Sequence, residues 1–284
     1  MESYYQLRLF GLSILILLTH IKEIHLSNKH SISHNIVLQT DFNKSDEEVT
    51  TGTMDKIVDQ GGPVMANAKV QLIFWGDWND SSLNPSKATI EAAIQKIINS
   101  EYYSKLSQYR GIQKPAYLGS VVNKTSHLPD IFEDSAIEKA IGDSIQNGSV
   151  PDFRSFTNGQ IMYIVIPTPG HVSDNTKYDA FHYNFTYQGN DEGVYAVYSW
   201  RFNKERELEW ITRALAHEIA EACTNPVDDK EAFVDPNLDD PDKNEIADFC
   251  EKECYLISVP FVNGVTVEGY WSNLDGGCVI PGRE

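Results

Sequence analysis

The segment RALAHEIAEACTNP, residues 213–226, carries one histidine and two glutamates among alanine, leucine, isoleucine and cysteine. In a helix, His217 and Glu221 are four residues apart and share one face, one turn from each other. A separate apolar stripe is formed by Leu208, Ile211, Leu215 and Ile219. Buried carboxylates are costly unless they are paired or bind a metal. The pattern therefore predicts a covered helix that presents His217 and Glu221 to an enclosed site.

Few basic residues are available to neutralise this helix. Arg213 lies one turn before His217, off the face that Glu221 occupies, and the next basic residue after Glu221 is Lys230. The pattern H-E-x-x-E is a one-letter variant of the zinc-protease helix H-E-x-x-H, in which the residues at i and i+4 bind zinc and the intervening glutamate is the base. We therefore predict His217 and Glu221 as ligands and Glu218 as the base. A solvated charged face and a buried network of proton-sharing carboxylates are the alternatives.

The segment NEIAD, residues 244–248, supplies the missing groups. A catalytic zinc needs a third protein ligand and an open position for water. Glu245 can be that third ligand, and Asp248 can accept a hydrogen bond from the second ring nitrogen of His217, which fixes its tautomer. Because a His-Glu-Glu set is harder than His-His-Glu, zinc is favoured and manganese or calcium remains an alternative.

His182, in the stretch DAFHYNF, is a further candidate that we expect in a long loop between two strands. It could bind the metal or, together with Tyr183, stabilise a developing oxyanion as part of the catalytic machinery.

The surrounding pattern predicts the elements that position these groups. Buried strands are expected around Val70, Leu72 and Phe74, at 160–170 and at 193–200. Helices are expected after a cap at Ser86, over 135–145, and from about 204 to 224, where Asn225-Pro226 ends the last one. Asn263-Gly264 predicts a hairpin in a β-rich C-terminal tail. The expected fold is one α+β domain with a mixed sheet.

Charge and targeting signals bound the class of protein. The formal net charge of −18 argues against nucleic acid as a partner, because no basic stripe offsets it. Residues 1–20 contain the apolar run LFGLSILILL, which predicts a signal peptide or an uncleaved N-terminal anchor. Residues 21–60 resemble a polar linker or pro-segment, and the domain is expected over 61–284. We therefore expect a secreted or cell-surface protein, with membrane attachment only through an uncleaved N-terminal segment.

Cysteines and glycosylation signals agree with export. The four cysteines Cys223, Cys250, Cys254 and Cys278 predict two disulfides with three possible connectivities, and a four-cysteine zinc site is the weaker alternative. Five N-x-S/T sequons, which indicate a glycoprotein, start at Asn43, Asn79, Asn123, Asn147 and Asn184.

Two family resemblances follow from these motifs. H-E-x-x-E with the later N-E-x-x-D resembles the thermolysin-like gluzincins, whose N-E-x-x-S-D segment supplies the third ligand and the aspartate that orients a histidine. Here the segment is one residue shorter, so Glu245 and Asp248 can exchange roles.

The chain also resembles secreted microbial proteins that are similar to the plant phosphate-induced, EXORDIUM-like family. The stretches that carry this resemblance are GGPVMANAKVQLIFWG, HEIAEACTNP, EIADFC and WSNLDGGC. That resemblance implies export and a single domain over about 61–280. The plant relatives lack the full His and Glu set.

Three functions remain open from the sequence. The first is an exported zincin-like metallohydrolase, a zinc peptidase acting on peptides or cell-surface substrates. The second is a non-catalytic EXORDIUM-like surface protein with a structural metal site. The third, a carbohydrate-binding wall protein, rests only on aromatic residues such as Tyr270 and Trp271. Glu218 favours the enzyme, because a structural site needs no base between its ligands.

Overall fold

The computed structural model describes residues 57–156, 160–175, 177–189, 191–200, 206–238, 244–250 and 261–283. All of these lie in one compact unit, Thr51–Glu284. The predicted targeting segment, and all but the last four residues of the predicted linker, lie outside the described residues. None of the helices in the described ranges is both long enough and apolar enough to span a membrane.

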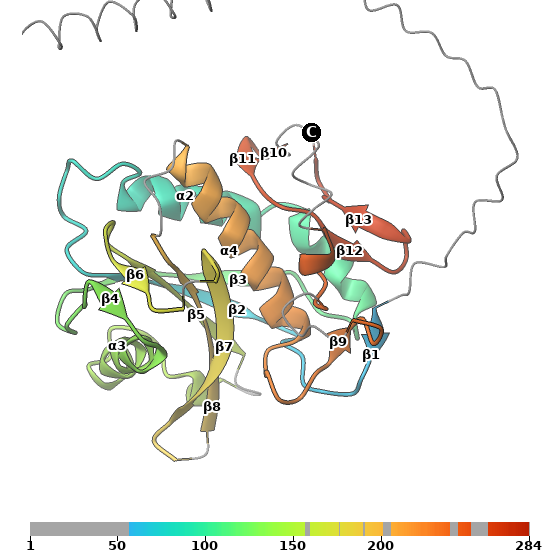
Figure 1. Cartoon of the computed structure of the whole chain (residues 1–284), viewed down its shortest axis with the longest axis horizontal. Coiled ribbons are helices and arrows are strands. Elements are labelled where there is room, and N and C mark those ends of the chain that lie inside the picture. Colours follow the sequence, from blue (N-terminus) through green and yellow to red (C-terminus); the bar gives the residue numbers. More distant parts are fainter. Residues whose placement is uncertain are drawn as a thin grey trace, which may run out of the picture. The chain divides into compact units, whose positions relative to one another are not determined.

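A five-stranded mixed sheet with the order β3-β2-β5-β8-β7 is the centre of the fold (Figure 1). Its strands are β2 (Lys69–Trp75), β3 (Ala116–Asn123), β5 (Ile161–Pro167), β7 (Ala180–Tyr187) and β8 (Asp191–Tyr198). The pairs β2–β3, β2–β5 and β5–β8 are parallel, whereas β7 pairs antiparallel with β8. Every residue of the central strand β5 is buried, as expected for a parallel strand that is covered on both faces.

Alternate residues of each strand supply two separate cores. Leu72, Ile164 and Ala196 face α2 (Lys87–Ile98) and α4 (Glu207–Thr224), while Ile73, Val165 and Val197 face α3 (Asp134–Gln146). Figure 1 accordingly shows α3 on one side of the sheet and the other two helices opposite it. The predicted α+β fold with a mixed sheet is therefore confirmed.

The helices begin and end close to the predicted positions. The side chain of Ser86 accepts a hydrogen bond from the Thr89 backbone N–H, so it caps α2 as predicted. Ile90, Ala93, Ile94 and Ile97 of that helix are buried, in agreement with the apolar spacing. Two 3₁₀ helices, η1 (Tyr102–Gln108) and η2 (Phe153–Ser155), are also present, and residues 248–250 are helical.

Four short strand pairs surround the sheet. They are β1 (Val58–Asp59) with β9 (Phe233–Val234), β4 (Ile131–Phe132) with β6 (Val172–Ser173), β10 (Phe261–Val262) with β11 (Val265–Thr266), and β12 (Tyr270–Ser272) with β13 (Gly277–Val279). The β10–β11 turn is the predicted hairpin: Asn263 and Gly264 both have positive φ, as a type I′ turn requires. The predicted β-rich tail is present in this form.

The structure corrects three sequence expectations. His182 lies on the edge strand β7, not in a loop, because Phe181, Tyr183 and Phe185 alternate with polar residues and pack on the α3 core. The folded unit also begins before residue 61, since β1 pairs with β9. One disulfide, Cys250–Cys278, is present, but Cys223 is a buried free thiol and not half of a second one. Cys254 lies outside the described residues.

Candidate metal centre

The second half of α4 is buried on every side. Leu215 and Ile219 pack into the core against the sheet, and the contacts of α4 include β7, β8 and α2. His217, Glu218 and Glu221 are carried into the interior on the same turns of the helix. Their side chains are 11%, 9% and 3% exposed, which excludes a solvated charged face.

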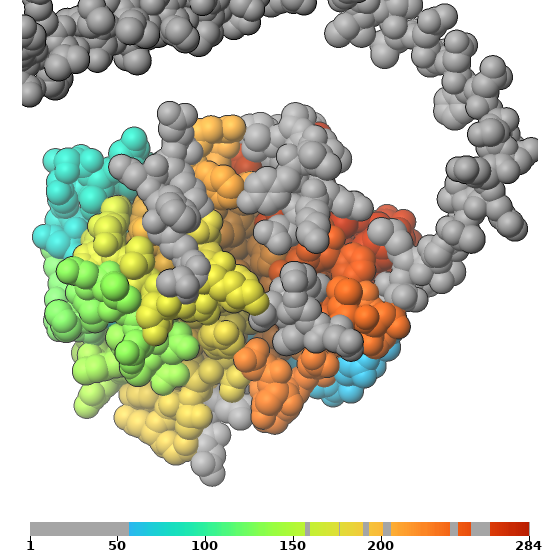
Figure 2. Space-filling model, in the orientation of Figure 1, coloured from blue at the N-terminus to red at the C-terminus, as the bar shows by residue number. Residues whose placement is uncertain are grey.

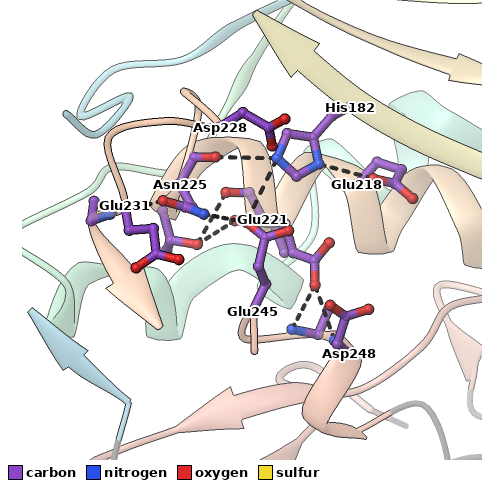
Figure 3. Close-up of polar contacts among 12 residues, drawn as sticks. His182, Glu218, Glu221, Asn225, Asp228, Glu231, Glu245 and Asp248 are labelled. Carbon is purple, nitrogen blue, oxygen red and sulfur yellow. Dashed lines mark hydrogen bonds and ion pairs between the residues drawn. The ribbon is translucent and has the colours of Figure 1, made fainter. Parts of the chain in front are cut away.

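Two further chain segments meet this half of the helix. His182 comes from the edge strand β7, and Glu245 and Asp248 come from the segment 244–250 (Figure 3). On the face shown in Figure 2, β7 lies beside the loop that follows α4, where the Asp228 backbone N–H donates to Asn184 Oδ1 at 3.4 Å. All six predicted site residues are thus brought together.

His182 connects the helix to the acidic segment. Its Nδ1 lies 3.0 Å from Glu218 Oε2, and its Nε2 lies 3.1 Å from the Asn225 carbonyl and 3.8 Å from Glu245 Oε1. Asn225, just past the end of α4, donates from Nδ2 to Glu245 Oε1 at 2.6 Å. The residue that stops the helix therefore also fixes Glu245.

Glu221 is held from two directions. Its Oε1 accepts the backbone N–H groups of Ala247 at 3.1 Å and Asp248 at 3.0 Å. Its Oε2 lies 3.0 Å from His217 Nε2. This carboxylate thus docks the acidic segment onto α4.

The two nitrogens of His217 have different partners. Nε2 faces Glu221 and also lies 3.4 Å from Asp248 Oδ1. Nδ1 lies 3.4 Å from Glu268 Oε2, and Glu268 is paired with Arg213 at 3.1 Å. Asp248 was expected to bind the ring nitrogen of His217 that does not face Glu221, and this expectation is wrong. Asp248 faces the same nitrogen as Glu221, and Glu268 faces the other one.

The electrostatics show an excess of negative charge. Burial would lower the pKa of His182, but the carboxylates of Glu245 and Glu218 outweigh it and raise that pKa to about 10. Burial similarly opposes a charged His217, yet Glu221 and its neighbouring carboxylates raise the pKa of this histidine well above its usual value. Both imidazoles are therefore drawn toward the cationic form.

The carboxylates respond in the opposite direction. Burial raises the pKa of Glu221 to about 8, with repulsion from Asp248 adding to the rise and His217 opposing it. Burial also raises the pKa of Glu245 to about 7, while His182 opposes the rise. Neutralisation by the histidines is thus incomplete, which is the situation that a bound cation relieves.

Two donor triplets among the described residues have ligand atoms that all lie within 4.8 Å of one another. One is His217, Glu218 and Glu221, and the other is His182, Glu221 and Glu245. Glu245, predicted as the third ligand beside His217, is instead grouped with His182. Imidazole and carboxylate donors suit divalent cations, so these buried His/Glu groups could hold a metal ion.

Sequence reasoning missed Glu268 and the role of Arg213. Glu268 stands in the tail stretch VTVEGYW, 51 positions after His217, with no spacing that connects it to the helix. The one available signal is an acidic residue in an otherwise apolar stretch that the structure buries. Arg213 was expected off the Glu221 face, and it does contact Glu268 and the Trp210 ring instead.

Comparison of the chain with protein-family models, with curated proteins and with solved structures finds no match in any of the three.

Proposed function

We propose that the protein is an exported metal-dependent hydrolase, and specifically a zinc peptidase. The observation that carries the proposal is the buried convergence of two imidazoles and four carboxylates from α4, β7 and the segment 244–250. Arg213, the cation beside this cluster, is already engaged by Glu268. A divalent cation is a simpler neutraliser for such a set than protons shared among the carboxylates.

In this proposal His217 and Glu221 hold the metal, and the segment 244–250 supplies the remaining protein ligand. Asp248 fits that role because its Oδ1 faces the same ring nitrogen as Glu221, whereas Glu245 is grouped with His182 and Glu221. Asp248 thus takes the ligand role that the gluzincin resemblance suggested for Glu245, while Glu268, not Glu245, faces the other ring nitrogen of His217. Zinc is proposed first, with manganese or calcium as alternatives. When bound, the metal would lower the pKa of a water and polarise a scissile carbonyl.

Glu218 is the proposed proton acceptor. It follows His217 directly in the chain and belongs to the same donor triplet, so its carboxylate lies within reach of the same space. His182 Nδ1, 3.0 Å away, holds Oε2 of Glu218 and leaves the other carboxylate oxygen to accept a proton. His182 is thus proposed to position the carboxylate of Glu218.

Export is supported by the disulfide. Cys250–Cys278 ties the segment that carries Glu245 and Asp248 to the C-terminal hairpin, and structural disulfides persist in oxidising compartments.

Glycosylation is proposed at Asn79 and Asn147, which are exposed. Asn123 is buried and donates its amide to Ser126, Ala140 and Ser144, so it is excluded from the proposal.

The second candidate is a non-catalytic surface protein with a structural metal site, in line with the EXORDIUM-like resemblance. The observation in its favour is that the site is closed to solvent. The six cluster side chains are at most 17% exposed, and they are hydrogen-bonded or ion-paired with one another. Structural sites are closed, whereas catalytic sites keep an open position.

Glu218→Gln tests the enzyme. The change keeps the shape of the side chain and removes its basicity, so cleavage of a peptide library should fall about 10²- to 10⁴-fold while metal content stays at the wild-type value. Glu101→Gln, in an exposed ion pair with Lys114, is the matched control and should cleave normally.

Two results separate the candidates. Undiminished cleavage by Glu218→Gln would refute the proposed base. A wild-type protein that contains metal, loses thermal stability on chelation and cleaves no member of the library would instead support the structural site.

A further inference from the structure

The two donor triplets overlap in one residue. His217, Glu218 and Glu221 form the triplet on α4, and His182, Glu221 and Glu245 form the triplet toward β7. Each triplet has its own histidine and its own second carboxylate, and both contain Glu221. Such an arrangement is the donor pattern of two neighbouring cations that share a carboxylate.

We propose that the cluster binds two divalent cations, with Glu221 as their common ligand. This inference rests on the proposed metal centre and deepens it. The first ion would be held by His217 and Glu221 of the α4 triplet, with Asp248, whose Oδ1 lies 3.4 Å from His217 Nε2, in place of Glu218, the proposed base. The second would be held by His182, Glu221 and Glu245.

The chemistry of Glu221 allows the shared role. A carboxylate has about four lone-pair positions on its two oxygens. Oε1 accepts two backbone N–H groups, from Ala247 and Asp248, which fix the side chain in place. Oε2 lies 3.0 Å from His217 Nε2, and its lone pairs could bind cations when that nitrogen is deprotonated.

Charge balance also favours two ions over one. Glu218, Glu221, Glu245 and Asp248 are four carboxylates in a site whose side chains are at most 17% exposed. Two divalent cations neutralise all four while both histidines bind as neutral imidazoles. With both histidines neutral, a single ion would leave an excess of two buried negative charges, and uncompensated buried charge is strongly destabilising. Glu268 does not enter this balance, because it is paired with Arg213.

The geometry separates the two sets of ligands. His182 approaches from the edge strand, and its Nε2 lies 3.1 Å from the Asn225 carbonyl oxygen, which can also face a cation, and 3.8 Å from Glu245 Oε1. His217 approaches from the helix, and its Nε2 faces Asp248 at 3.4 Å. Each histidine therefore has its own acidic partner from the segment 244–250.

The test counts ions on the full chain. Chelator-treated protein is titrated with Zn²⁺ alone, and the ions retained per chain after gel filtration are measured by elemental analysis. We expect two for the wild type and for the exposed control His127→Ala, one for His182→Ala, and none for Glu221→Gln. Glu245→Gln, which keeps the side-chain volume, is the second variant for the outer site and should also retain one, with circular dichroism verifying its fold.

Each outcome decides a different point. One ion in the wild type that His182→Ala leaves in place would overturn the two-ion inference and leave the proposed metal centre intact. Two ions that neither His182→Ala nor Glu245→Gln reduces would overturn the assignment of the second site. No retained ion in the wild type would overturn both the inference and the proposed function.

Discussion

Glu221 is the residue through which the parts of the site are connected. Its carboxylate receives two backbone N–H groups from the acidic segment and faces His217 from the same helix. Burial raises its pKa to about 8 because the charged form has lost its water. Burying a carboxylate beside other carboxylates destabilises the folded protein, and a bound cation would offset this cost.

Glu268→Gln tests whether His217 is oriented for a metal. The substitution keeps the side-chain shape but removes the negative charge that faces His217 Nδ1 and pairs with Arg213. Loss of such a partner typically weakens metal binding about 10- to 100-fold. Competition with a chromophoric zinc chelator measures the affinity.

The control for that measurement lies on the same helix. Glu209→Gln alters an ion pair with Arg206 in the first turn of α4, remote in sequence from the cluster, and should bind zinc as the wild type does. Equal zinc affinity for Glu268→Gln and the wild type would show that Glu268 does not orient a ligand.

At the residue scale, the sequence predicted what local spacing can encode. His217, Glu218 and Glu221 lie within one helical turn, so their convergence follows from the period of the helix. Asp248 was assigned to the wrong ring nitrogen of His217 because sequence carries no information on which way an approaching loop turns. Glu268 was missed because only the folded tail brings it to the helix.

The backbone just after β1 packs very closely against the loop that precedes β9, with Gly62 at the point of contact. A Cβ on Gly62 would lie 2.0 Å from the Lys230 carbonyl oxygen and 2.3 Å from that of Glu231. The Gly62 backbone N–H also donates to the Glu231 carbonyl at 3.0 Å. These contacts are with backbone, which cannot rotate away, so glycine is required there.

Gly62→Ala should therefore destabilise the fold. The overpacking is expected to cost about 1 to 3 kcal/mol, which lowers the Tm by roughly 2 to 12 °C for a domain of this size. Gly277→Ala is the matched control, because a Cβ there meets nothing within 4 Å and the backbone is not in the left-handed region. A Gly62→Ala protein that melts with the wild type would refute the close approach.

Whether a segment forms a helix or a strand was easier to predict from the sequence than which segments it packs against. The central strand β5 is a continuous apolar run and α2 has a cap with an apolar stripe, so both were predicted within a few residues. The edge strand β7 was expected to be a loop because one of its faces carries polar side chains, His182 and Asn184, that face the site and not the core. An edge strand with a functional face lacks the simple apolar signal of a central one.

At the scale of the whole molecule, the site depends on contacts between segments that are far apart in the sequence. The segment 244–250 is held by the Cys250–Cys278 disulfide and by a hydrogen bond from the Trp271 backbone N–H to the Ile246 carbonyl at 2.7 Å. The C-terminal tail therefore positions the acidic residues against α4. Composition predicted an acidic domain with a core of ordinary size, but not that the tail completes the cluster.

We propose above all that the buried cluster holds a metal ion, and measuring the metal content of purified protein tests this proposal. Elemental analysis should find a divalent metal, zinc first, in the wild type and in the exposed control His127→Ala, and much less in His217→Ala, which has lost an imidazole donor. Circular dichroism would verify that the variant is folded. Equal metal content in the wild type and a folded His217→Ala protein would contradict the account.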